Sequence, residues 1–304
     1  MGRRVVPALV QAGFTVTAVG RSPETRQFLA GAGAVPIEVD LFNAEAVQQA
    51  LVGQEVVINL TTSIPSISHM FLPGAWRMND RVRRHVSANL VSAALTNGAA
   101  RYIQESFAPI YPDCGDRWID ESTPVSPVKY NRTVLDAEAA AARFTQGGGT
   151  AVGLRFASFY GPDSDFTRMI LNNIRRGFAP MFGAPEAYFT SLSHDDAASA
   201  VVAAFNLPGG MYNVAEDEPL TRQEYVDSLA QELGVRLPSL LPRWMAKLAG
   251  SLGEMLERSL RISNRKLKAE SSWEPRYPSM YTGWPAVLSA IERGSRSPLV
   301  ESSH

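Results

Sequence analysis

Strand-like and helix-like segments alternate through the first half of this chain, and this alternation limits its fold more than any other feature. Apolar, β-branched runs typical of strands lie at residues 14–19, 34–40 and 55–63. Amphipathic segments typical of helices lie at 3–12, 23–33 and 43–53, and capping residues such as Ser22 and Asn43 precede two of them. Because parallel strands need a crossover between them, the sequence predicts an α/β fold with a doubly wound parallel sheet.

The same alternation continues to residue 161 and then weakens. We expect helices at 79–96 and 128–144 and strands at 100–111 and 150–161. Thr221 and Glu224 have the spacing of a capping box at the start of a later helix. We therefore predict a main domain over residues 1–162 and a smaller lobe over 163–290. Within that lobe, residues 190–213 are expected to pack back on the first domain, and residues 291–304 are expected to be a disordered tail.

Composition excludes several classes of protein. The formal net charge of −1 gives no nucleic-acid footprint. No apolar run reaches the roughly 18 to 20 residues that cross a bilayer, and Pro7 and Gln11 make the beginning of the chain a poor signal peptide. Cys114 is the single cysteine, which rules out an internal disulfide and fits a reducing compartment. We expect a cytoplasmic protein that binds no membrane and no metal.

Several short segments, taken in order, carry a family resemblance. They include VGRS, VDLFN, VVINLTTS, RYIQESFAPIY, SPVKYNRTVLDAE, GLRFASFYGP and SLSHDDAASAV. Each segment alone is weak, but their order resembles that of extended short-chain dehydrogenases/reductases, in the NAD-dependent epimerase/dehydratase family. The resemblance implies a Rossmann-like domain that binds NAD(P), followed by a lobe that binds substrate.

The beginning of the chain differs from the pattern of that family. Its members start with an apolar strand and a glycine-rich turn that lets backbone N–H groups reach the coenzyme pyrophosphate. Gly2 matches the last glycine of that turn, and the strand and the other glycines are missing here. The missing strand would lie inside the sheet, so its loss leaves a gap between neighbours. Either the natural protein is longer, or this is a shortened product that binds coenzyme weakly or not at all.

The resemblance also implies coenzyme contacts. Arg21 and Ser22 follow the second expected strand, where an arginine suits the 2′-phosphate of NADP, so NADP is favoured over NAD. The alternative is that Arg21 only faces solvent. Asp40 follows the next strand and either holds adenine or stabilises a turn. The other expected coenzyme contacts are Gly2, Leu41, Leu60, Thr61, Tyr111, Arg155 and Phe156.

The catalytic pattern is incomplete. Tyr130 lies where the family has its proton-transferring tyrosine, and Ser106 is the nearest hydroxyl on the preceding strand. The family lysine four residues after the tyrosine is replaced by Val134. Without that cation, Tyr130 is expected to keep a pKa of about 10 and to be a poor base at neutral pH. Alternatively, Ser106 is a loop hydrogen-bonding residue and Tyr111 a packing residue.

Further contacts and partners follow from the resemblance alone. Tyr160, Arg261 and Asn264 are the expected substrate contacts, with packing as the alternative. A homodimer through the helices at 79–96 and 130–144 is possible. The sequence thus predicts an NAD(P)-dependent oxidoreductase or epimerase/dehydratase-like enzyme acting on a small hydroxyl or carbonyl compound or a nucleotide-sugar. The alternatives are a dinucleotide-binding sensor without turnover and an inactive truncated product.

Overall fold

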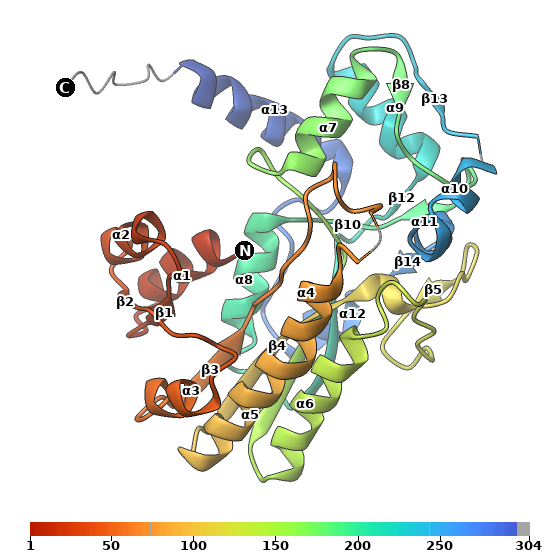
Figure 1. The fold of residues 1–304 in the computed structure, drawn as a ribbon. Helices are drawn as coiled ribbons and strands as arrows, with labels where there is room; N and C mark the ends of the chain where they lie inside the picture. The colour runs from red at the N-terminus through yellow and green to blue at the C-terminus, as the bar shows by residue number, and fades with distance from the viewer. Residues whose placement is uncertain (73, 243, 297–304) are drawn as a thin grey trace.

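The computed structural model describes residues 1–72, 74–242 and 244–296, and its main body is a parallel sheet covered by helices (Figure 1). Four strands pair in the order β11–β6–β4–β3, and every pairing is parallel. Their bounds are β3 Val56–Asn59, β4 Arg101–Phe107, β6 Thr150–Phe156 and β11 Gly210–Val214. The α/β fold expected from the alternating pattern is confirmed.

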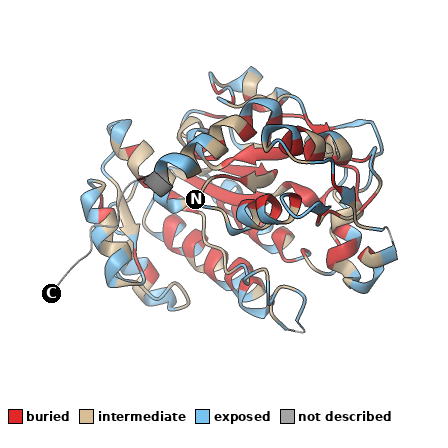
Figure 2. Ribbon diagram, turned by 90° about the horizontal axis from the view of Figure 1, so that it is seen from above, coloured by how far each residue is buried: buried red, intermediate tan, exposed pale blue. Residues whose placement is uncertain are grey.

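Neighbouring residues of a strand pack into two different hydrophobic cores, because side chains alternate between the two faces of a sheet. Tyr102 and Ala151 pack with α3 (Ala44–Ala50), α5 (Ser87–Thr96) and α6 (Val134–Gln146). Ile103 and Val152 pack on the opposite face with α1 (Gly2–Gln11), α8 (His194–Ala203) and α12 (Arg265–Glu270). Buried residues accordingly concentrate in the central strands (Figure 2).

The N-terminal part forms a separate small sheet. Strands β1 (Thr17–Val19) and β2 (Val35–Ile37) pair in parallel, with Thr17 opposite Val35. Helix α2 (Pro23–Gly31) connects them, and α1 packs against α8. Within the described part of the chain, neither strand is hydrogen-bonded to β3. The expected gap in the sheet therefore lies between β1 and β3.

The C-terminal lobe packs around Tyr160, Tyr225 and Trp284. Strand β11 and helix α8 belong to the main body, so residues 190–213 lie against the first domain. The capping box of Thr221 and Glu224 is present at the start of α9. The remaining elements are α7 Asp165–Ile174, α9 Arg222–Glu232, α10 Trp244–Leu248, α11 Gly250–Glu257, α13 Met280–Arg296, and the short strands β5 Trp118–Ile119, β7 Ser158–Tyr160, β8 Phe178–Ala179, β9 Tyr188–Phe189, β10 Ser191–Ser193, β12 Leu220–Thr221, β13 Ser239–Leu240 and β14 Arg261–Ile262.

Three segments differ from the sequence-based expectation. The helix expected over 128–144 begins at Val134, because residues 129–133 form tight turns in which Val134 N donates to Asn131 O at 3.1 Å. The helix expected over 79–96 is continuous but contains a π-helical turn, η1, at Val82–Val86, between α4 (Arg77–Arg81) and α5. Residues 291–296 belong to α13, so the tail does not begin at 291, and residues 297–304 lie outside the described residues.

Candidate active site

A cavity of about 1080 Å³ lies between β1 and β3, in the gap of the sheet. Gly2, Leu41, Leu60 and Thr61, four of the predicted coenzyme contacts, line it together. Leu41 follows β2, and Leu60 and Thr61 follow β3, so these residues lie at the carboxyl ends of parallel strands, where α/β proteins bind ligands.

The first turn of α1 opens into the same cavity. Met1 to Val5 all belong to its lining, and the space beside Gly2 is open, since an added Cβ would meet no atom within 4 Å. The first N–H groups of a helix have no partner within the helix and favour an anion. These N–H groups and the apolar Leu41 and Leu60 are groups that could hold an adenine dinucleotide, and the coenzyme roles of Gly2, Leu41, Leu60 and Thr61 stay predictions.

The remaining predicted residues of the coenzyme edge lie outside the lining of that cavity. Arg21 is exposed in the turn after β1. Ser22 caps α2 by accepting a hydrogen bond from Thr25 N at 3.2 Å, and Asp40 accepts one from Phe42 N at 3.0 Å. Ser22 and Asp40 therefore stabilise local structure here, and the coenzyme roles of all three residues stay predictions.

Ser106, Tyr111 and Arg155 form one buried network around Glu138. The guanidinium of Arg155 makes two 2.8 Å contacts with the Glu138 carboxylate, through Nε to Oε1 and Nη2 to Oε2. Ser106 Oγ donates to the same Oε1 at 2.5 Å. Arg155 Nη1 also donates to the Tyr111 hydroxyl at 2.7 Å, and that hydroxyl donates to Asn213 Oδ1 at 2.9 Å.

The polar atoms of Ser106, Tyr111 and Arg155, which the sequence predicts to contact coenzyme or substrate, make hydrogen bonds within this network. The Ser106 hydroxyl points at Glu138, Arg155 is 6% exposed, and Tyr111 is fully buried. Phe156 is fully buried in the core as well. The structure therefore brings Ser106, Tyr111 and Arg155 together with each other and with Glu138, while the ligand contacts assigned to them stay predictions.

Tyr130 lies in the turns before α6, in an apolar environment. Its ring meets the edge of Trp76 with centroids 4.4 Å apart, and it packs on a cluster that includes Val128, Leu252 and Met255. Burial raises the pKa of Tyr130 above its ordinary value; Arg83 opposes this shift and Asp80 adds to it. The phenol is thus held in its protonated form, more firmly than the expected pKa of about 10 implies.

Two buried charged residues, of which one acts on Tyr130, were missed by sequence reasoning. Arg83, in the π-helical turn, and Glu105, on β4, are each 8% exposed. Burial raises the pKa of Glu105, and Arg83 opposes that shift. By contrast, Lys129 and Arg132 are exposed, as surface charges are expected to be.

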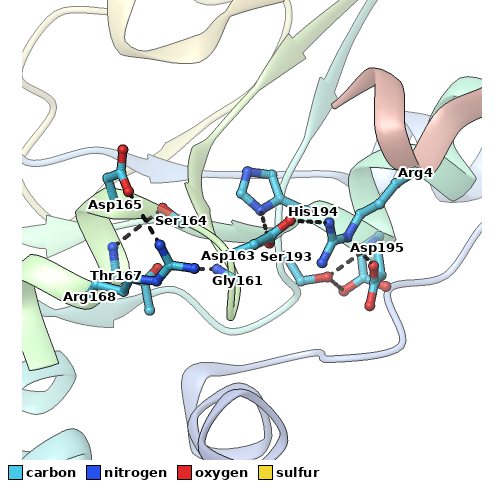
Figure 3. Close-up of polar contacts among 11 residues, drawn as sticks. Arg4, Gly161, Asp163, Ser164, Asp165, Thr167, Arg168, Ser193, His194 and Asp195 are labelled. Carbon is cyan, nitrogen blue, oxygen red and sulfur yellow. Dashed lines mark hydrogen bonds and ion pairs between the residues drawn. The ribbon is translucent and has the colours of Figure 1, made fainter. Parts of the chain in front are cut away.

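Arg4 joins α1 to the C-terminal half (Figure 3). Its Nη1 contacts Asp163 Oδ2 at 2.8 Å, and its Nε contacts Asp195 Oδ1 at 2.5 Å. His194 Nδ1 lies 4.0 Å from Asp163 Oδ1, and the ring stacks on Phe159 at 5.3 Å. Burial, with help from the charges of Arg4 and the N-terminal amine, lowers the pKa of His194 to about 4. This cluster closes one end of the cavity with a neutral imidazole and a paired arginine.

Each predicted substrate contact packs against other residues of the protein. Tyr160 is 2% exposed, with its ring 6.1 Å from that of Trp284, and lines a second cavity of about 530 Å³. Arg261 lies over the Trp118 ring at 4.3 Å. Asn264 donates to Ala215 O at 2.8 Å. These contacts stabilise the packing of the lobe, and the substrate roles of the three residues stay predictions.

The described residues lack a metal-ligand cluster and a membrane-spanning helix. No group of three or more histidine, cysteine, aspartate or glutamate side chains there could hold a metal ion. Of the described helices, none is both long enough and apolar enough to cross a membrane.

Comparison with known proteins shows an NAD(P)H-binding domain in the N-terminal half of the chain. Residues 1–151 match the family model described as NAD(P)H-binding. The chain is 28% identical to a 3-diazoavenalumate denitrifying reductase from a Streptomyces species, over 93% of this chain and 95% of that protein. It is 24% identical to a 2-alkyl-3-oxoalkanoate reductase of Shewanella oneidensis, over 88% and 71% of the two chains.

Solved structures share the fold. Human epimerase family protein SDR39U1 with NADPH superposes with a TM-score of 0.79 at 18% identity, over 96% of this chain and 95% of that one. UDP-glucose 4-epimerase of Thermus thermophilus with NAD superposes with a TM-score of 0.75 at 21% identity, over 97% and 96%. At these identities the likeness concerns the fold.

Proposed function

We propose that this chain, whose residues 1–151 match the NAD(P)H-binding family model and whose fold is that of the epimerase structures, is an NADPH-dependent reductase of a small carbonyl compound. The observation that carries this proposal is Tyr130, a phenol kept protonated by burial near the carboxyl end of β4. A protonated phenol is a proton donor, which suits reduction of a carbonyl better than oxidation of an alcohol.

The protonation state of Tyr130 decides which group supplies the proton and which supplies the hydride. A reduced nicotinamide coenzyme, when bound, supplies the hydride to the carbonyl carbon. Tyr130 breaks its O–H bond and gives the proton to the substrate oxygen, which becomes a hydroxyl group. The Arg155–Glu138 pair fixes the end of β6 against α6, and Trp76 packs against the Tyr130 ring.

The side chains around Tyr130 favour a substrate with an apolar body. Met70, Phe107 and Leu256 complete the cluster around its ring. Such a wall suits an alkyl or aryl ketone better than a nucleotide-sugar, whose hydroxyls would lose their hydrogen bonds with water. The name of the Shewanella relative, an oxoalkanoate reductase, supports the same class. The homodimer expected from the sequence stays a proposal.

A coenzyme and substrate screen tests the proposal. NADPH and NADH are titrated by protein fluorescence, and oxidation of NADPH is then followed by absorbance with aryl ketones, alkyl ketones and 3-oxo acids. We expect Tyr130→Phe to lower kcat by about 10²-fold or more, the contribution of a general acid. Tyr281→Phe is the matched control, because Tyr281 is 53% exposed on α13. An unchanged kcat in Tyr130→Phe removes Tyr130 from the mechanism, and failure to bind either coenzyme refutes the proposal.

Val134 supports a second candidate, a dinucleotide-binding protein without turnover. It lies 1% exposed on α6, where the family resemblance implies a lysine. Tight coenzyme binding without oxidation of NADPH by any member of the panel is the result that favours this candidate.

A further inference from the structure

Arg83 is a largely buried cation without a direct partner in the described part of the chain. Its side chain belongs to a residue that is 8% exposed in the π-helical turn Val82–Val86. Among the described residues, its guanidinium makes no hydrogen bond and no ion pair under 4 Å. None of its nitrogens is fully buried, so the guanidinium keeps some contact with solvent. Charged side chains this far buried are usually paired, and a cation in such a place favours an anion beside it. Arg83 therefore needs an explanation beyond packing.

Two contacts place the π-helical turn beside the Tyr130 segment. Thr133 Oγ1 donates to Asp80 Oδ1 at 2.8 Å, and Arg84 Nε contacts Asp136 Oδ2 at 2.8 Å. Asp80 and Arg84 flank Arg83 in sequence, while Thr133 and Asp136 follow Tyr130 closely. The two contacts fasten the helix to this segment on both sides of Arg83. A π-helical turn adds a residue to the helix and redirects its side chains, and such turns are frequent at functional sites.

The charges that act on Tyr130 are few. Arg83 favours its phenolate form and Asp80 disfavours it, while burial opposes any charge there. Glu105 of β4 is the other group that Arg83 affects, and Glu138 of α6 adds repulsion on Glu105. Arg83 is thus the single cation that acts on both buried acids among the residues described.

We propose that Arg83 is the positioning cation for Tyr130, stabilising the phenolate that remains once the hydroxyl has given its proton to the substrate oxygen. The inference rests on the proposed function and deepens it. In the step, the O–H bond of Tyr130 breaks and a new one forms on the substrate, so the negative charge moves onto the tyrosine oxygen. Solvent then returns a proton to that oxygen. Arg83 acts on this charge through space from the turn that packs on α6, so the step does not need a lysine at position 134.

The test measures the acidity of residue 130 without turnover. A fluorinated tyrosine, whose phenol titrates well below that of tyrosine, replaces Tyr130, and its phenolate absorbance is followed against pH. We expect Arg83→Gln to raise its pKa by about one unit or more, a tenfold change in acidity, since a nearby cation favours the phenolate. Arg83→Lys keeps the charge and is expected to recover most of this shift.

Controls separate the charge from the fold. Arg132→Gln changes an exposed arginine two residues from Tyr130 and is expected to leave the pKa of residue 130 unchanged. Circular dichroism shows which variants are folded, and Arg83→Met gives the same comparison if Arg83→Gln unfolds. An unchanged pKa in a folded Arg83→Gln or Arg83→Met variant overturns the inference. If the wild-type protein shows no turnover, the proposed function fails while the pKa measurement still stands. Failure of the proposed function and failure of the inference about Arg83 are therefore distinguishable.

Discussion

The buried ion pair between Arg155 and Glu138 makes a quantitative prediction about stability. The two side chains are 7% and 12% exposed and share two 2.8 Å contacts. Arg155→Met leaves Glu138 with only the Ser106 hydroxyl and takes from Tyr111 its 2.7 Å partner. Breaking a buried pair in this way costs about 3–5 kcal/mol of unfolding free energy. With a urea m-value of about 3 kcal/mol/M, the lower figure moves the unfolding midpoint down by about 1 M.

Urea unfolding of four proteins tests this prediction: wild type, Arg155→Met, Glu138→Leu and the double variant. We expect the double variant to recover a large part of the loss, because it leaves no unpaired charge behind. The exposed pair of Arg84 and Asp136, with side chains 50% and 45% exposed, is the control, and Arg84→Met should cost about 0–1 kcal/mol. If Arg155→Met costs no more than that control, the network does not hold β6 against α6.

Three further predictions concern other parts of the chain. Arg21→Ala is expected to weaken NADPH about tenfold, or about 1.4 kcal/mol, and NADH much less; equal losses in fluorescence titrations would mean that Arg21 does not read the 2′-phosphate. His194 has its pKa lowered from 6.5 to about 4, so between these values the unfolded chain binds a proton that the folded chain does not, and stability falls as the pH drops from 6.5 towards 4. His194→Gln should remove about 2 kcal/mol of that fall between pH 7 and pH 5, and parallel urea curves at these two pH values for both proteins check it. Thr221→Ala removes the capping box of α9 and should cost about 1 kcal/mol in urea; no measurable loss would mean that the lobe does not depend on this cap.

Much of the fold was predictable because its helices and strands carry local sequence signals. Apolar runs between glycine and capping residues mark β3, β4 and β6, and Ser22 and Asn43 do cap helices, with side chains that accept from the backbone at 3.1–3.2 Å. The start of α6 was less predictable. Residues 129–133 read as helix, but Asn131 Nδ2 donates to Pro109 O at 2.9 Å, a contact made across 22 residues. Such a distant partner is invisible to helical periodicity, and it holds the segment in turns.

The site was predictable only where backbone position decides it. Gly2, Leu41, Leu60 and Thr61 share a cavity because parallel strands end at one edge of a sheet. Pairings between side chains, such as Arg155 with Glu138, depend on how α6 packs on β6 and had no local signal. Arg83 did leave a signal: Asn79, Val86 and Leu90 are buried at helical spacing, and position 83 falls on their side. A charge on an apolar face of a helix is the kind of exception that merits attention.

The separation of β1 and β2 from the main sheet bears on how the molecule unfolds. The N-terminal unit from α1 to β2 is held to the main sheet and its helices by the packing of α1 on α8 and by the paired Arg4. In the described structure, no strand of this unit is hydrogen-bonded to β3. The backbone amides of this unit should therefore exchange with solvent through local opening, at a free energy below that of global unfolding. A molecule that contacts both α1 and β3 across the cavity would stabilise the N-terminal unit on the main sheet. Local opening of that unit and global unfolding would then occur as one cooperative transition.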